Sequence, residues 1–159
     1  MIFSAVFIFS FRYKFMDYVI RPAKENDIEQ IQRIEEESFA CPFSGEQFLK
    51  LYLSYKKIFF VAGKNKEILG YIAGVRGFGK ITVASFAVKE EYRKRGIATG
   101  LMRHFIKKAK TMVKTVELQA RVSNKPAIFF YEKMGFTCRN ILSGYYPDKE
   151  DAILYIKIF

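Results

Sequence analysis

Apolar residues recur along the chain at two spacings, every second residue in some segments and every third or fourth residue in others. The first spacing is typical of strands and the second of helices that bury one face. Seven strands are predicted, at residues 18–21, 57–63, 68–77, 80–88, 115–122, 136–142 and 152–158. Four helices are predicted, at residues 25–39, 45–55, 97–113 and 125–133. The pattern therefore indicates an α/β domain in which helices flank a mixed sheet.

Short polar segments separate these elements. Lys64-Asn65-Lys66 and Gly77-Phe78-Gly79 have the composition of hairpin turns, which makes the three strands around them antiparallel neighbours. The break at Cys41-Pro42-Phe43-Ser44 ends the first helix region. Ser44 is then the predicted N-cap of the second helix.

The first fifteen residues stand apart from this arrangement. Their aromatic residues all fall at odd positions, a period of two that is compatible with a strand: Phe3, Phe7, Phe9, Phe11, Tyr13 and Phe15. A secretory signal is disfavoured because the segment has no basic start and no small-residue cleavage site. An added strand at a sheet edge is a second interpretation, and translation from Met16 is the third and the one we favour. The domain is accordingly predicted to span residues 16–159.

Length and composition indicate one domain with a substantial core. Half of the 159 residues are apolar and 17% are aromatic. No run reaches the roughly 18 to 20 apolar residues that span a bilayer, so no membrane partner is expected. Cys41, Cys138 and the single histidine, His104, are too few for a disulfide framework or a metal cluster. We interpret the cysteines as small core or loop residues, His104 as a surface residue, and the setting as reducing and cytoplasmic.

The charge of the chain is strongly positive. The 27 lysines and arginines exceed the 16 aspartates and glutamates and give a net charge of +11, which favours a polyanionic partner. A phosphate-bearing cofactor is one such partner, and a ribosome or a nucleic acid is another, although no RNA-binding motif accompanies the charge. Lys107, Lys108, Lys110 and Lys114 lie on or just after one predicted helix, where a solvated face is the simpler interpretation.

A short basic junction, Arg93-Lys94-Arg95-Gly96-Ile97-Ala98, joins the strand at 80–88 to the helix at 97–113. The first N–H groups of a helix have no partner within it, so a strand that continues into a helix through a glycine offers them to an anion. Gly96 permits a close approach of the backbone, and the small Ala98 keeps the first turn tight. The junction lacks the ending of a P-loop and the three glycines of a dinucleotide fingerprint. It predicts a diphosphate site of another kind, with a basic, solvated helix start as the alternative.

This junction resembles the Arg/Gln-x-x-Gly-x-Gly/Ala signature with which the GNAT acyltransferases bind the diphosphate of coenzyme A. Other segments resemble the RimI-like branch, which acetylates protein N-termini, and its archaeal relatives. They are Pro42-Phe43-Ser44, Arg121-Val122-Ser123-Asn124 with Tyr131-Glu132 and Gly135-Phe136, and Gly144-Tyr145-Tyr146-Pro147 with Glu150-Asp151-Ala152. The resemblance covers residues 17–159. It implies the GNAT fold, a mixed and mostly antiparallel sheet splayed between the fourth and fifth strands, with acetyl-CoA as the cofactor.

The resemblance also implies which residues bind the cofactor. The fourth strand ends at Phe86-Ala87-Val88, whose backbone N–H groups would pair with the pantetheine arm and polarise the thioester carbonyl. The diphosphate would bind at Arg93, Lys94, Arg95, Gly96, Ile97, Ala98 and Thr99. Asn124 is expected either to contact the pantetheine or to cap the helix that follows it. Tyr131 resembles the family tyrosine that hydrogen-bonds the coenzyme sulfur and suits a general acid, with an aromatic core residue as the alternative.

The general base of the RimI-like enzymes is missing from its usual position. These enzymes carry a glutamate two residues before the motif arginine, where this chain has Gln119, and an amide takes up no proton at neutral pH. Glu117 points to the same side of the strand and is either the holder of a water chain or an exposed strand charge. Glu35, Glu36 and Glu37 are further candidates, with a solvated turn as the alternative.

The absence of this base affects which amine can accept the acetyl group. An α-amine with a pKa near 8 is about a tenth neutral at pH 7, whereas a lysine amine is almost wholly charged, so a weak base harms lysine transfer more. We therefore predict acetyl transfer to protein N-termini by direct attack in a ternary complex. Phe43, Tyr145 and Tyr146 are predicted to bind the acceptor, with an aromatic turn as the alternative for the tyrosines. Other interpretations are a lysine or small-amine acetyltransferase and a catalytically weak, CoA-binding or ribosome-associated module.

Overall fold

The computed structural model describes residues 17–159, so the interpretations of residues 1–15 lie outside it. The described chain forms one sheet of seven strands, in the spatial order β1-β2-β3-β4-β5-β7-β6. The strands are β1 (Val19–Pro22), β2 (Phe59–Lys64), β3 (Glu67–Gly77), β4 (Lys80–Val88), β5 (Thr115–Arg121), β6 (Thr137–Leu142) and β7 (Ala152–Ile158). Every pair is antiparallel except β4 with β5. The predicted α/β class and the mixed, mostly antiparallel sheet are confirmed.

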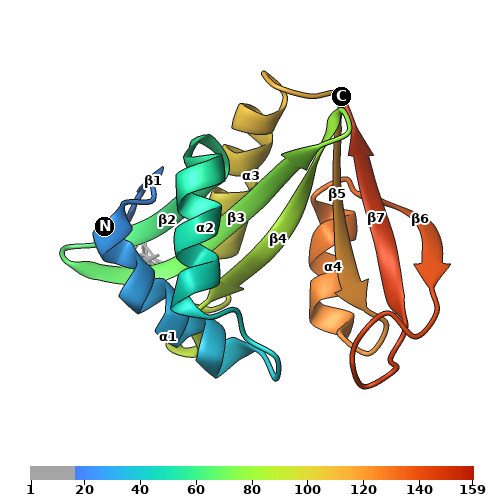
Figure 1. Ribbon diagram of the computed structural model, residues 1–159, viewed down its shortest axis with the longest axis horizontal. Helices are drawn as coiled ribbons and strands as arrows, with labels where there is room; N and C mark the ends of the chain where they lie inside the picture. Colours follow the sequence, from blue (N-terminus) through green and yellow to red (C-terminus); the bar gives the residue numbers. More distant parts are fainter. Residues whose placement is uncertain (1–16) are drawn as a thin grey trace, which may run out of the picture.

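Four helices cover the sheet, two on each face (Figure 1). They are α1 (Ile28–Ser38), α2 (Gly45–Tyr55), α3 (Ile97–Ala109) and α4 (Lys125–Lys133), with short 3-10 turns at Glu25–Asp27, Lys56–Ile58 and Glu90–Tyr92. Ser44 caps α2 as predicted, because its hydroxyl accepts from the Gln47 N–H. The predicted end of α3 at residue 113 is wrong. The chain tightens into i to i−3 bonds at Thr111 and Met112, so the α-helix stops at Ala109.

Each face of the sheet has its own core. Beneath α3 and α4 the core includes Leu101, Phe105 and Leu118, and beneath α1 and α2 it includes Phe48 and Tyr71. The sheet therefore separates two layers, and side chains that alternate along a strand enter one layer or the other.

The single histidine and the two cysteines lie at the surface. His104 is exposed as predicted, with its ring 4.7 Å from that of Phe60. Cys41 lies in the loop between α1 and α2, in agreement with its interpretation as a loop residue. Cys138 was expected in the core or a loop, and this is wrong because it is exposed on β6, at the outer edge of the sheet.

The sheet opens between β4 and β5. The two strands pair only through Lys80, Ile81 and Thr82, opposite residues 115–117, and then diverge (Figure 1). Farther along β4, the pairing with β3 passes from Val83 directly to Ser85, so Ala84 is an extra residue. Such a bulge bends its strand and increases the local twist. The splay implied by the family resemblance is present, and it leaves one edge of β4 open from residue 83 to residue 88.

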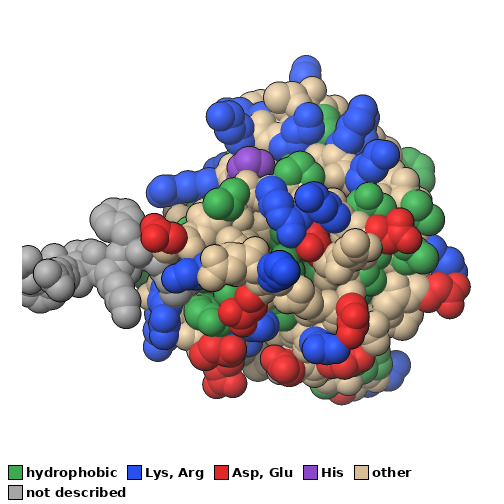
Figure 2. Space-filling model, turned by 90° about the vertical axis from the view of Figure 1, so that its left-hand side faces the viewer, with side chains coloured by type: hydrophobic (Ala, Val, Ile, Leu, Met, Phe, Trp, Pro, Cys, Tyr) green, Lys and Arg blue, Asp and Glu red, His purple; other side chains and the backbone are tan. Residues whose placement is uncertain are grey.

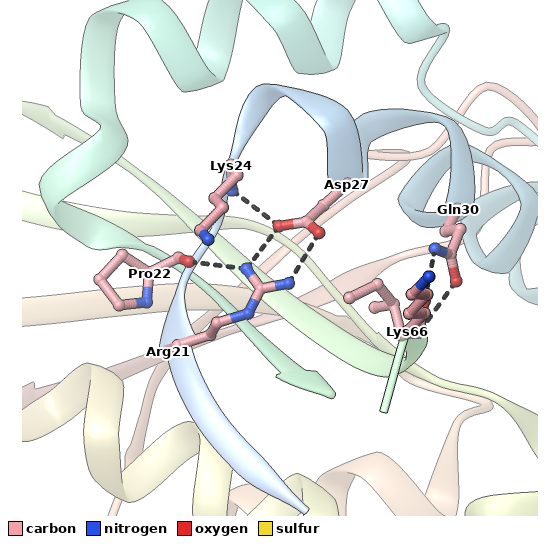
Figure 3. Close-up of polar contacts among 7 residues, drawn as sticks. Arg21, Pro22, Lys24, Asp27, Gln30 and Lys66 are labelled. Carbon is pink, nitrogen blue, oxygen red and sulfur yellow. Dashed lines mark hydrogen bonds and ion pairs between the residues drawn. The ribbon is translucent and has the colours of Figure 1, made fainter. Parts of the chain in front are cut away.

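A bidentate ion pair fixes the start of α1 to the edge of the sheet (Figure 3). The guanidinium of Arg21 on β1 donates to both carboxylate oxygens of Asp27, at 2.7 and 2.8 Å, and the Lys24 N–H donates to the same carboxylate at 2.7 Å. Burial raises the pKa of Asp27, but the hydrogen bonds from Arg21 and Lys24 outweigh it and hold the pKa below its ordinary value. The pair therefore stabilises the fold at neutral pH and is lost only as the pH falls through that lowered pKa.

Within residues 17–159, no helix combines the length and the apolar character required to cross a membrane.

Candidate active site

The turn before α3 has the backbone shape of an anion site. Lys94 and Gly96 both have positive φ angles, 57° and 82°. The first intrahelical bond runs from the Gly100 N–H to the Gly96 carbonyl, so the N–H groups of residues 97–99 have no partner within the helix. No side chain of the described residues caps them. Three backbone donors at the positive end of a helix dipole therefore fit a diphosphate.

Two glycines shape this turn for different reasons. Nothing lies within 4 Å of a Cβ built on Gly96, so its left-handed backbone, rather than crowding within the protein, favours glycine there. A Cβ on Gly100 would come within 2.8 Å of the Tyr18 hydroxyl oxygen and 3.0 Å of Ile20 Cδ1. The N-terminal strand thus packs directly on the first turn of α3, where Tyr18 also donates to the Gly96 carbonyl at 3.4 Å.

The basic side chains of the turn do not all point outward. Arg93 Nε donates to the Val88 carbonyl at 3.0 Å and so connects the turn to the end of β4. The guanidinium carbon of Arg95 lies 5.6 Å from the centre of the Tyr92 ring. The predicted cofactor residues Arg93 and Arg95 therefore hold the turn in place, while the backbone of residues 97–99 offers the anion donors.

The second half of the predicted cofactor site lies across the gap, on α4. The Asn124 side-chain oxygen accepts from the Ala127 N–H at 3.2 Å, so Asn124 caps the helix. No described residue accepts from its Nδ2, which leaves that group for a ligand. Of the two roles expected for Asn124, capping is the one present in the structure, and contact with the pantetheine stays a prediction.

Tyr131, on α4, lies among aromatic rings. Its ring centre is 5.5 Å from that of Phe130 and 6.1 Å from those of Phe136 and Tyr155. No described residue hydrogen-bonds its hydroxyl. Burial, and to a lesser extent Tyr146 nearby, raise the pKa of Tyr131 well above that of a free phenol. Tyr131 is thus a packed aromatic residue whose hydroxyl stays protonated, but the raised pKa makes it a weaker acid than a free phenol, and its role as proton donor stays a prediction.

The two catalytic candidates on β5 face away from Tyr131. Leu118 is buried beneath α3 and α4, so its neighbours Glu117 and Gln119 project to the face of α1 and α2. Glu117 pairs with Lys80 at 2.7 Å and accepts from the Thr82 hydroxyl at 3.0 Å, with only 12% of its side chain exposed. The interpretation of Glu117 as an exposed strand charge is wrong. It lies at the closed end of the gap, and Gln119 lies two residues nearer the open end.

The three glutamates at the end of α1 have different surroundings. Glu36 and Glu37 are exposed, as a solvated turn requires, but Glu35 is only 2% exposed. Its Oε2 accepts from the hydroxyls of Tyr71 and Ser85, the latter at 2.7 Å, and its Oε1 accepts from the Phe43 N–H at 3.0 Å. The expected solvated turn is therefore wrong for Glu35. Its carboxylate joins α1, both strands β3 and β4, and the loop of residues 39–44.

An ion-pair cluster holds the loop between β6 and β7. Arg121, at the end of β5, donates to Glu150 at 2.6 Å and to Asp148 at 2.8 Å, and its guanidinium carbon lies 3.9 Å from the Tyr146 ring centre. Glu150 also accepts from the Ser123 N–H at 2.9 Å. Hydrogen bonds from Ser123 and Arg121 lower the pKa of Glu150 to about 2. The loop that carries the two predicted acceptor tyrosines is therefore clamped to β5.

The predicted acceptor residues lie on two loops at the same end of the molecule. In Figure 1 the loop between α1 and α2 and the loop between β6 and β7 lie at the lower edge, where β4 and β5 diverge. Phe43 packs against Phe48, with ring centres 5.8 Å apart, and Tyr145 stands edge-on to Tyr146 at 5.1 Å. Half of Tyr145 is exposed. The two tyrosines form the aromatic turn that was the alternative expectation, and their binding of the acceptor stays a prediction.

Two groups of the site were missed or undervalued by sequence reasoning. The helical period gives a signal for Glu35, because it follows the apolar positions Ile28 and Ile31 at spacings of seven and four and so shares their buried face. Arg121 and Glu150 were part of matched motifs, but their pairing joins residues 29 positions apart and has no signal in local pattern.

The sequence matches the model of the Acetyltransferase (GNAT) family over residues 28–136. The chain belongs to this family. It is therefore an acyltransferase whose acetyl donor is acetyl-CoA, and the uncapped turn before α3, with its left-handed Gly96, fits the diphosphate of that donor.

Particular relatives agree with the RimI-like and archaeal resemblance. An N-alpha-acetyltransferase of Saccharolobus solfataricus is 38% identical over 152 residues, which covers 87% of this chain and 91% of the relative. Ard1 from Thermoplasma volcanium has a TM-score of 0.85 at 29% identity, over 89% of this chain and 97% of that one. The ribosomal-protein-S18-alanine N-acetyltransferase from Escherichia coli has a TM-score of 0.81 at 27% identity, over 89% and 94%.

The clamp on the loop between β6 and β7 can be tested by replacing Glu150→Gln. Loss of the charge weakens the contacts to Arg121 and Ser123, so we expect the KM for the acceptor to rise severalfold while the KM for acetyl-CoA changes little. Steady-state kinetics in both substrates provide the measurement. The control is Asp148→Asn, which removes a carboxylate that is 59% exposed and should have a smaller effect. Equal effects of the two changes would contradict the clamp.

Proposed function

We propose that the protein transfers the acetyl group of acetyl-CoA to the α-amine of a protein N-terminus, by direct attack within a ternary complex. The main observation behind this proposal is that the predicted donor-binding residues and the predicted acceptor-binding residues lie on opposite faces of the splayed sheet. The turn before α3 and Tyr131 lie on one side, and Glu35, Ser85 and Gln119 lie on the other. Donor and acceptor then approach the gap from opposite faces and meet at the open edge of β4.

The two loops at the open end suit the end of a peptide. Phe43 and the Tyr145-Tyr146 pair border the gap from two sides, and each loop is fixed by a carboxylate, Glu35 for the first and Glu150 for the second. Preformed walls of this kind lower the entropy that the protein's own loops lose when a chain end binds. The relative named N-alpha-acetyltransferase and the structure named ribosomal-protein-S18-alanine N-acetyltransferase support this choice of acceptor.

The reaction needs one proton donor and one proton acceptor. The neutral amine attacks the acetyl carbonyl, whose developing negative charge is stabilised by N–H groups along the open edge of β4. The carbon–sulfur bond then breaks, and the Tyr131 hydroxyl donates a proton to the departing thiolate. The amine loses one proton as the amide forms.

We assign Glu35 as the final acceptor of that proton. Gln119 cannot take it up, and Glu117 is already paired with Lys80 at the closed end of the gap. The Ser85 hydroxyl, on β4 and 8% exposed, donates to Glu35 and can pass on a proton that it receives from the amine or from a water molecule. This route runs on the same face as the proposed acceptor site.

Association with a ribosome and a location in the cytoplasm stay predictions of the sequence. The net charge of +11 supports the former.

The acceptor class is tested with a panel of short peptides that differ in their first residue, with and without a blocked N-terminus. We expect thiol release from acetyl-CoA only with free N-termini, because the α-amine is neutral far more often than a lysine amine at pH 7. Following free thiol, with mass spectrometry of the peptides, gives the readout. Acetylation of blocked peptides at lysine, with none at free N-termini, would overturn the proposal.

The proton donor is tested by replacing Tyr131→Phe. The ring packing is kept and only the hydroxyl is lost, so kcat should fall by about ten- to a hundredfold while acetyl-CoA affinity is nearly unchanged. Turnover kinetics and calorimetric titration separate the two effects. The matched control is Tyr155→Phe, whose hydroxyl donates to Glu132 in the same aromatic cluster. An unchanged kcat in Tyr131→Phe would remove its role as acid.

The proton acceptor is tested by replacing Glu35→Gln, which preserves size and one carbonyl oxygen. We expect kcat/KM to fall by about ten- to a hundredfold. The remaining rate should rise with pH through the pKa near 8 of the substrate's α-amine, since only the neutral amine then reacts. Glu36→Gln, its exposed neighbour, is the control. A lower melting temperature with an unchanged pH profile would limit Glu35 to holding the loop of residues 39–44.

A further inference from the structure

A cationic groove, separate from the turn before α3, lies between the C-terminal halves of α3 and α4. It measures about 590 Å³, and Ile106 and Met134 contribute its apolar surface. All its other lining residues carry positive charge: Arg103, Lys107, Lys110, Lys133 and Lys157. They come from α3, the end of α4 and β7, so folding brings together cations that are distant in sequence.

Among the described residues, no carboxylate neutralises these charges. Lys157 donates to the carbonyls of Met134 and Gly135, at 3.0 and 3.2 Å, which fixes its ammonium group at the groove. Five like charges around one hollow repel one another unless an anion lies among them.

The favourable position of lysine at a helix C-terminus explains only part of this arrangement. The negative end of the helix dipole stabilises Lys107 on α3 and Lys133 on α4. It does not account for Arg103, in the middle of α3, or for Lys157, on a strand. On the face shown in Figure 2, the upper part carries lysines and arginines with hardly any acidic side chains, which gather lower down among further basic ones.

The groove is too far along α3 to hold the phosphates of acetyl-CoA. A helix rises 1.5 Å per residue, so Lys107 and Lys110 lie about 16 to 21 Å beyond the turn at Gly96, and only Arg103 lies nearer, at about 10 Å. The 3′-phosphate of coenzyme A is on the ribose next to the diphosphate and cannot reach so far. The groove therefore suits a polyanion other than coenzyme A.

We infer that this groove binds the phosphate backbone of RNA. A succession of phosphates along a flexible strand matches several cations set around a hollow, and long lysine and arginine side chains are the usual phosphate contacts. A membrane surface is flat and would meet recessed charges poorly, and an acidic protein partner is expected to need a larger apolar centre than two side chains. The choice of RNA over DNA rests on the proposed function, because new protein N-termini arise beside RNA.

The test compares two triple variants of the full chain. One removes groove charges, Lys107→Gln, Lys110→Gln and Lys133→Gln. The other removes three exposed lysines elsewhere, Lys50→Gln, Lys64→Gln and Lys66→Gln. Each is titrated against a fluorescent single-stranded RNA of mixed sequence at several salt concentrations, and anisotropy reports binding. This readout is independent of acetyl transfer, so failure of the proposed function leaves it interpretable.

We expect the groove variant to bind RNA at least about tenfold more weakly than the wild type at low salt, and the slope of log affinity against log salt to flatten by about 2, or about 0.7 for each lost contact. The control variant should change far less, and the KM for acetyl-CoA should stay the same in both. Equal losses in the two variants would mean that net charge alone binds RNA. A raised KM for acetyl-CoA in the groove variant, or equally tight wild-type binding to polyglutamate or anionic vesicles, would also overturn the inference.

Discussion

The short parallel pairing of β4 with β5 is the constraint on which the remaining structure depends. Three residues of each strand hold the sheet together, and the extra residue Ala84 then turns β4 away while its bonds to β3 continue. The sheet gives up ladder hydrogen bonds along its centre, and in exchange unpaired backbone groups lie along the diverging edges of β4 and β5.

Separate polar clusters fix the two sides of the gap. On the β4 side, the buried Glu35 carboxylate joins the hydroxyls of Tyr71 and Ser85 to the loop of residues 39–44. On the β5 side, Arg121 and Glu150 hold the loop after β6. Hydrogen bonds to a charged group are stronger than neutral ones and fix geometry better than apolar packing. The loops that border the gap are thereby positioned without covering it.

Periodicity and local motifs predicted the elements and the turn at Gly96, because both depend on residues close together in sequence. They missed what depends on tertiary structure. Three consecutive glutamates look alike until the packing of α1 buries only Glu35. Nothing in the local sequence indicates that Glu117 is paired, because its partner Lys80 lies on a strand 37 positions earlier. Cys138 was misplaced for a similar reason, because tertiary pairing puts β6 at the edge of the sheet. The cations of α3 were interpreted as a solvated face because Lys133 and Lys157, which are distant in sequence, come close to them only in the folded structure.

The two-sided gap has a consequence for chemical inhibition. If nucleotide and peptide enter from opposite layers, a small molecule lodged against Phe43 and Tyr145 blocks one entrance and leaves the other free. Such a compound would be noncompetitive toward the thioester, and abundant cellular nucleotides would not displace it. Discrimination among related enzymes would then come from the loops beside α1 and β6 rather than from the shared phosphate-binding turn.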